Sequence, residues 1–198
     1  QGALVELEHV IEMARRLGNG DIEAHAIATK ALAHGRLGHF ALARQEAQLA
    51  LAYSGTRSSP IPEADLYNMA GFVYLDMGDV ERSEQYGQLG AQKGIEANAA
   101  GNLCVALSRL QKRQVPEAQQ AFVEAIRLAD FASSGPLRNR GEGGLALAQF
   151  IAGNVEAMRD LEAAHQNAQA IDDQYSVAMF AQMLGDIATQ GGNFGQAE

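Results

Sequence analysis

The sequence repeats itself at intervals of about forty residues, and this self-similarity constrains the fold more than any other feature. A turn recurs at positions that lie 40, 35, 40 and 39 residues apart. These positions are Gly38, Gly78, Arg113, Gly153 and Gly192. An apolar residue follows each of them two positions later: Phe40, Val80, Val115, Val155 and Phe194. A fixed period of this length indicates one small structural unit stacked several times.

Small residues recur at fixed distances from these turns. Five residues after the turn come Ala43, Ser83, Ala118, Met158 and Ala197. Seven residues before it come Ala31, Gly71, Ala106, Ala146 and Gly185. Two antiparallel helices approach closely only where one of them carries little bulk. We therefore expect Gly71 and Ser83 to form a hole that a neighbouring aromatic side chain fills.

The segments between the turns have the composition and periodicity of helices. Alanine, leucine, glutamate and glutamine dominate, and only 4 prolines occur. Apolar residues recur three and four positions apart, as in Leu103, Leu107 and Leu110, which places them on one helical face. We expect about ten helices without strands, near 3–17, 21–37, 39–54, 62–77, 79–94, 96–112, 115–132, 136–152, 154–171 and 173–190.

The pattern resembles the tetratricopeptide repeat (TPR), in its long-period variant of about forty residues. Tyr67, Ala70, Gly71 and Tyr74 match the first helix of that repeat. Matches to the second helix and to a further first helix are Ala118, Phe122, Leu184 and Gly185. The resemblance covers essentially the whole chain and implies an all-α fold: a right-handed α-α superhelix, or solenoid, of tandem TPR-like helical hairpins.

The resemblance divides residues 1–198 into units of a single repeat domain. These units are a half repeat (1–20), four repeats (21–60, 61–95, 96–134 and 135–172) and a partial repeat (173–198). The chain starts without methionine and stops within an apparent helix, so we expect a fragment of a longer protein. Departures from the family pattern predict altered packing in the third and fourth repeats: Arg109, Arg113, Gln149 and Met158.

Charge and cysteine content exclude several classes of partner. The chain has 15 Lys and Arg against 24 Asp and Glu, a net charge of −9, which opposes binding to nucleic acid. No apolar run is long enough for a membrane helix, and no secretory signal is recognisable. The single cysteine, Cys104, lies in an apolar segment, where we expect a packing role. We therefore expect a soluble protein of the reducing cytoplasm, without nucleic acid or membrane as partner.

The sequence argues against catalysis, because no known set of catalytic residues is recognisable. The 5 histidines form no zinc-binding pattern, so we expect neither a metal nor a cofactor. His34 and His39 flank a turn that could by chance bring them together, although a solvated or capping role is favoured. The glycine-rich stretch Arg138–Gly144 predicts tight packing, or alternatively a contact between Arg140 and an acidic partner. An enzyme with its site at this stretch and the histidines stays open as a minor alternative.

The resemblance places function on the concave face, which the first helix of each repeat lines. The candidate binding residues there are Asn68, Phe72, Leu75, Leu103, Leu107, Arg140, Leu147, Phe150 and Gln182. Most of them are apolar, which suits an amphipathic helix or an extended apolar segment, although each leucine could equally belong to the core. The carboxylate clamp of the chaperone-binding family members is not recognisable.

The sequence therefore predicts a non-catalytic scaffold that binds a protein or peptide. An alternative is the sensor array of a bacterial signalling or transcription regulator, in which a small molecule or peptide alters how the repeats pack. Self-association is also expected, through apolar faces of the end repeats.

Overall fold

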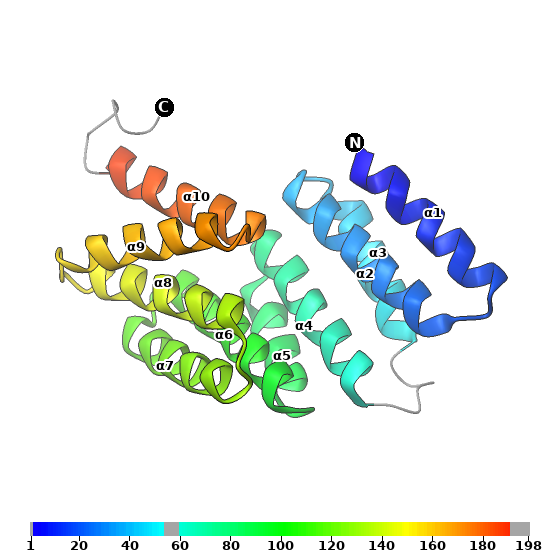
Figure 1. Cartoon of the computed structure of the whole chain (residues 1–198), viewed down its shortest axis with the longest axis horizontal. Coiled ribbons are helices and arrows are strands. Elements are labelled where there is room, and N and C mark those ends of the chain that lie inside the picture. Colours follow the sequence, from blue (N-terminus) through cyan, green and yellow to red (C-terminus); the bar gives the residue numbers. More distant parts are fainter. Residues whose placement is uncertain (1, 54–59, 191–198) are drawn as a thin grey trace.

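The computed structural model describes residues 2–53 and 60–190, and these residues form helices and turns without any strand (Figure 1). The ten helices are α1 (Gly2–Arg16), α2 (Gly20–Arg36), α3 (Phe40–Ala52), α4 (Pro60–Asp76), α5 (Val80–Ala91), α6 (Ile95–Gln111), α7 (Val115–Phe131), α8 (Gly135–Ile151), α9 (Ala157–Ala170) and α10 (Gln174–Gln190). No helix in these ranges combines the length and the apolarity needed to cross a bilayer. The turn expected at Gly192 lies outside the described residues.

The helices stack as hairpins in two layers. Each helix packs against the next along the chain, and α2, α4, α6, α8 and α10 also pack against one another in that order. Within the described residues, α3, α5, α7 and α9 do not approach each other within 8 Å between Cα atoms. The even-numbered helices are thus more closely spaced and form the inner layer of a curved stack (Figure 1). The expected all-α solenoid of helical hairpins is confirmed.

A left-handed residue follows the helix before each of the four recurring turns that the structure describes. Gly38, Gly78 and Gly153 have φ angles of 74°, 76° and 100°. Arg113 takes the same conformation, with φ of 63°, although a side chain there costs about 1–2 kcal/mol relative to glycine. The N–H of Gln114 still donates to the Arg109 carbonyl at 2.9 Å, as in the other turns. The third hairpin therefore keeps the common turn despite its arginine.

Helix α9 begins at Ala157, and the prediction of a start near residue 154 is wrong by about one turn. The N–H groups of Ala157, Met158 and Arg159 donate to carbonyls only three residues back, at 3.1–3.3 Å. Such bonds form a tighter turn than the α-helix. The Asn-Val-Glu segment after Gly153 therefore forms a 3₁₀-like entry rather than a first α-helical turn.

Three glycines allow α4, α5 and α6 to cross at backbone contact. A Cβ at Gly87 would lie 2.9 Å from the carbonyl oxygen of Gly101, and a Cβ at Gly101 would overlap the Gly87 carbonyl. A Cβ at Gly71 would lie 2.7 Å from the sulfur of Cys104. The hole at Gly71 and Ser83 is therefore filled by the Cys104 thiol, 3.2 Å from the Ser83 hydroxyl.

The expectation of an aromatic side chain in this hole is wrong. The backbones are too close there for a ring, and the aromatics of this region stack on one another instead. The rings of Tyr74 and Tyr86 lie 5.4 Å apart between centroids, with an angle of 13° between their planes.

Aromatic side chains do fill the holes in the fourth hairpin. A Cβ at Gly143 would fall on the ring of Phe180, and one at Gly144 would fall on the ring of Phe122. A Cβ at Gly141 would lie 2.6 Å from the Ile126 side chain. The packing explanation of the Arg138–Gly144 glycines is thus confirmed.

Gly101→Ala is expected to destabilise the protein, because the new methyl group meets backbone atoms of Gly87 and Ala91 that cannot move independently. Overpacking of this kind costs about 1–3 kcal/mol, and it outweighs the helix propensity gained from alanine. Gly185→Ala is the control, since a Cβ there meets no described atom within 4 Å and should stabilise α10 by up to about 1 kcal/mol. Urea unfolding measures both changes; equal effects would contradict backbone contact at Gly101.

Candidate functional site

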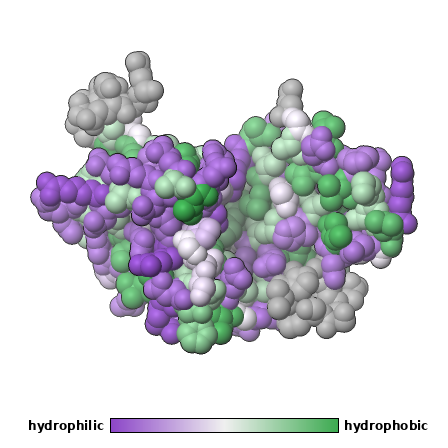
Figure 2. All heavy atoms as spheres, in the orientation of Figure 1, coloured by the Kyte–Doolittle hydropathy of each residue, from purple (hydrophilic) through white to green (hydrophobic). Residues whose placement is uncertain are grey.

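A row of apolar side chains follows the inner layer. Four residues occupy the same position in four helices that are each 17 residues long: Leu32, Phe72, Leu107 and Leu147. All four are half-buried and pack against core residues beneath them. Figure 2 shows the molecule hollowed between its N-terminal and C-terminal arms, with apolar surface inside the hollow. We call these four residues the apolar row.

Two arginines from opposite arms meet on one tyrosine ring. Tyr175 lies in the first turn of α10. The guanidinium carbon of Arg36, at the end of α2, lies 4.0 Å from the ring centroid, and that of Arg140, in α8, lies 4.5 Å from it. Both distances are well within the range of cation-π attraction. Burial raises the pKa of the Tyr175 phenol, against the opposing charges of Arg36 and Arg140.

Each arginine has its own carboxylate. Arg140 donates to both oxygens of Asp173, at 3.0 and 3.1 Å, and to the Ser176 hydroxyl at 2.9 Å. Arg36 lies farther from Asp76, with 3.9 Å between nitrogen and oxygen. Desolvation raises the pKa of Asp76, and the nearby Arg36 acts in the opposite direction. We call Arg36, Asp76, Arg140, Asp173 and Tyr175 the clasp.

The ion pair between Arg140 and Asp173 depends on an ionised Asp173 carboxylate. Burial acts to raise the pKa of this carboxyl, but hydrogen bonds from Ser176 and the charge of Arg140 outweigh it and lower the pKa. A lowered native pKa means that the pair stabilises the fold above the unfolded-state value of about 3.9. This stabilisation is lost as the pH falls through the native pKa, so the clasp is intact at neutral pH.

The clasp spans the solenoid through side chains alone. In the described part of the chain, α2 and α10 have no Cα atoms within 8 Å of each other. The contact between Arg36 and Tyr175 therefore joins the first hairpin to α10 without backbone packing. Arg140 and Leu147 are seven residues apart, and Phe72 and Asp76 are four apart, so each pair shares one helical face. The clasp and the apolar row hence line the same inner surface.

The predicted binding residues fall into two groups. Asn68, Leu75 and Leu103 are buried, and the Asn68 amide donates to the Ala97 carbonyl at 3.0 Å, so these three belong to the interior. The remaining six are accessible in whole or in part: Phe72, Leu107, Arg140, Leu147, Phe150 and Gln182. The acidic group that Arg140 meets is Asp173 of the same chain.

The sequence reasoning missed Tyr175, Asp173 and Ser176. They lie at the start of α10, outside the inner-face positions that the repeat pattern singles out. No local signal marks them, because Tyr175 meets Arg36 from the opposite end of the chain. Arg140 reaches them from the neighbouring helix α8, whereas only the curvature of the whole stack brings Arg36 to Tyr175.

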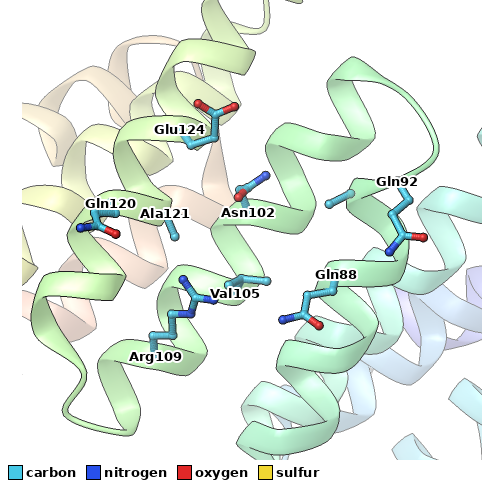
Figure 3. A pocket seen from close by; sticks show the side chains of 9 residues that line it. Gln88, Gln92, Asn102, Val105, Arg109, Gln120, Ala121 and Glu124 are labelled. Atoms are coloured by element: carbon cyan, nitrogen blue, oxygen red, sulfur yellow. The ribbon is translucent and has the colours of Figure 1, made fainter.

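A second groove of about 430 Å³ lies between α5, α6 and α7 (Figure 3). Its polar lining consists of four carboxamides and two charged residues: Gln88, Gln92, Asn102, Gln120, Arg109 and Glu124. Arg109 also donates to Glu84 at 3.0 Å, which holds its side chain against α5. This groove suits hydrogen bonding to uncharged polar groups, and the sequence reasoning missed it because it considered only the inner face.

Comparison with known proteins supports the fold. No family model matches the chain, and no curated protein sequence matches it. Among solved structures, the chain is similar to BtubC (BKLC) from P. vanneervenii, with a TM-score of 0.69 and 18% sequence identity. The match covers 98% of this chain and 85% of the BtubC chain. At this identity, the likeness extends to the fold alone.

Tyr175→Ala is expected to open the clasp, because it removes the ring on which both arginines rest. The free energy of unfolding should fall by about 1–3 kcal/mol, as for the loss of two partly desolvated cation-π contacts. Tyr175→Phe keeps the ring and should stay within about 1 kcal/mol of the parent protein. Urea unfolding gives these values, and small-angle X-ray scattering should show a larger radius of gyration for Tyr175→Ala only. Identical scattering from all three proteins would contradict a clasp that holds the two arms together.

Proposed function

We propose that this chain is a non-catalytic scaffold of the tetratricopeptide type, which binds a peptide segment of another protein on its inner face. The observation that carries the proposal is the apolar row, which stays half-buried along four successive inner helices. Half-buried apolar side chains in register offer contact area to a partner without requiring the core to open. The peptide is an amphipathic helix or an extended apolar segment.

The clasp complements the row, because it adds fixed charge to the same surface. Arg36 is the more available of its two cations, since its carboxylate partner Asp76 lies at 3.9 Å and its side chain is 45% exposed. A peptide that lies along the row therefore meets charged groups at one end of its path. Such charges set the orientation of a bound segment more than they set its affinity.

We further propose that the scaffold works in a reducing compartment such as the cytoplasm, since its single cysteine cannot form an internal disulfide. Burial raises the pKa of the Cys104 thiol to about 12, against hydrogen bonds with Ser83 and Ser108. The thiol is therefore protonated and unreactive, and its role is to fill the space beside Gly71.

Binding to the inner face is tested with peptides selected from a random displayed library on the purified chain. Phe72→Ala and Leu147→Ala should each weaken a selected peptide by roughly tenfold or more, because each removes apolar contact area worth about 1.4 kcal/mol or more. Val123→Ala is the matched control, since Val123 is exposed on α7 and outside the apolar row. Fluorescence anisotropy measures the dissociation constants, and circular dichroism checks that each variant is folded. Selected peptides that bind all three variants equally would refute the inner-face site.

A second candidate function is a sensor array, in which a bound ligand changes how the hairpins are arranged. The clasp favours it, because a contact of side chains alone between α2 and α10 can open without disrupting a helix interface. Spin labels on His25→Cys and Gln182→Cys, both at exposed positions, report the distance between the two arms. A sensor predicts that a selected peptide shifts this distance, whereas a rigid scaffold predicts the same distance with and without peptide.

A further inference from the structure

Two histidines face each other at the turn between α2 and α3. The Nδ1 atoms of His34 and His39 lie 3.1 Å apart, and their ring centroids are separated by 5.4 Å. Two imidazole nitrogens bound to one tetrahedral zinc ion, each at about 2.0–2.1 Å, lie roughly 3.3 Å apart. The observed separation is that of an N–H···N hydrogen bond, with the two nitrogens facing each other along the line between the rings. It is within a few tenths of an ångström of the spacing of two metal ligands, so a turn of the exposed His39 ring would direct both nitrogens at one ion.

His34 is held in the tautomer that metal binding requires. Its side chain is buried, and its Nε2 lies 3.7 Å from the Oε2 of Glu46 in α3. This Glu46 oxygen is buried and has no hydrogen-bond partner, while the other accepts from Lys30 at 2.6 Å. This distance is longer than a hydrogen bond, but the negative charge of Glu46 favours a proton on His34 Nε2, which leaves the lone pair on Nδ1 directed at His39. A small approach of the two groups would give the carboxylate–histidine hydrogen bond that commonly orients metal-binding histidines.

His39 is the solvent-exposed member of the histidine pair. It is exposed at the start of α3, and among the described residues its side chain accepts no capping hydrogen bond from the helix. Without a metal, His39 donates its Nδ1 proton to His34. When a metal binds, that proton moves to His39 Nε2 by way of solvent, so both Nδ1 lone pairs become available and no net proton is released.

We propose that His34 and His39 bind one divalent transition-metal ion of the zinc and copper type through their Nδ1 atoms, with Glu46 as the orienting residue. Imidazole nitrogens suit Zn²⁺ and Cu²⁺ better than they suit Mg²⁺ or Ca²⁺. In the described residues no group of three His, Cys, Asp or Glu side chains could hold a metal, so water completes the coordination. The site lies at the turn between α2 and α3 and includes no residue of the apolar row, so it does not rest on the proposed peptide groove.

The metal would also stiffen the end of α2. It would join the last turn of α2 to the residue just before α3, on either side of Gly38. Arg36 lies two residues beyond His34 and extends from the same turn toward Tyr175. Metal binding would therefore fix the helix end from which the clasp starts.

The test is titration of the chain with ZnCl₂ and CuCl₂ alone, by isothermal calorimetry at neutral pH. We expect saturable binding of one ion, and a Cu²⁺ electron paramagnetic resonance spectrum with hyperfine splitting from two nitrogens. His39→Ala should abolish both, and Glu46→Gln should weaken binding by about tenfold, as is usual for an orienting carboxylate. His9→Ala is the control, since His9 is exposed on α1, and it should bind as the parent protein does.

Thermal unfolding provides a second readout for each variant. An ion that binds the folded chain raises the melting temperature, so Zn²⁺ should raise it in the parent protein and in His9→Ala but not in His39→Ala. If His39→Ala does not fold, His34→Gln replaces it. No saturable binding in the parent protein, or binding that His39→Ala and His34→Gln leave unchanged, would overturn the proposal.

Discussion

Backbone contact between α4, α5 and α6 is the constraint on which the rest of the solenoid depends. Gly87 and Gly101 let two helices approach until each glycine meets the carbonyl of the other. Gly71 admits the Cys104 thiol beside the same crossing. Because no side chain fits at these points, the backbone contacts fix the distance between the second and third hairpins. The curvature of the inner layer follows from that spacing.

The clasp is a consequence of the curvature and has a different physical character. Cores of packed backbone and buried side chains resist partial opening, since any gap loses contacts that water cannot replace. The contact of Arg36 and Arg140 with Tyr175 is made by side chains of opposite arms, and each charge keeps a carboxylate of its own nearby. It can therefore open while every hairpin stays folded. This difference makes the inner surface suitable for a ligand that enters between the arms.

The two grooves of the protein offer different chemistry. The inner surface combines the apolar row with charged groups, whereas the groove between α5, α6 and α7 is lined mainly by carboxamides. An apolar peptide segment therefore gains more contact area on the inner surface. The histidine pair stands apart from both, at the turn that carries the clasp's first arginine.

The period of the turns and the small residues determined the class of fold, because each is a local requirement. A left-handed turn and a close helix crossing each depend on residues of one hairpin. The structural roles of Gly38, Gly78 and Gly71 could therefore be predicted from the sequence. The side chain that fills each hole was less predictable, because it depends on how far apart the backbones lie. The Cys104 thiol lies beside Gly71, whereas the rings of Phe180 and Phe122 lie beside Gly143 and Gly144.

The proposed binding surface was only partly predictable from the sequence. The register of Phe72, Leu107 and Leu147 follows from helix periodicity, and the pattern placed these residues on the inner face. Asn68 and Leu103, each four residues before a member of the row, are buried, and the Asn68 amide bonds to the Ala97 carbonyl of α6. The meeting of Arg36 with Tyr175 could not be foreseen, since it depends on the rotation summed over the hairpins between α2 and α10. The sequence determines contacts within a hairpin, because they depend on residues close together in the chain. Contacts between distant hairpins depend on the curvature of the whole stack, which only the tertiary structure decides.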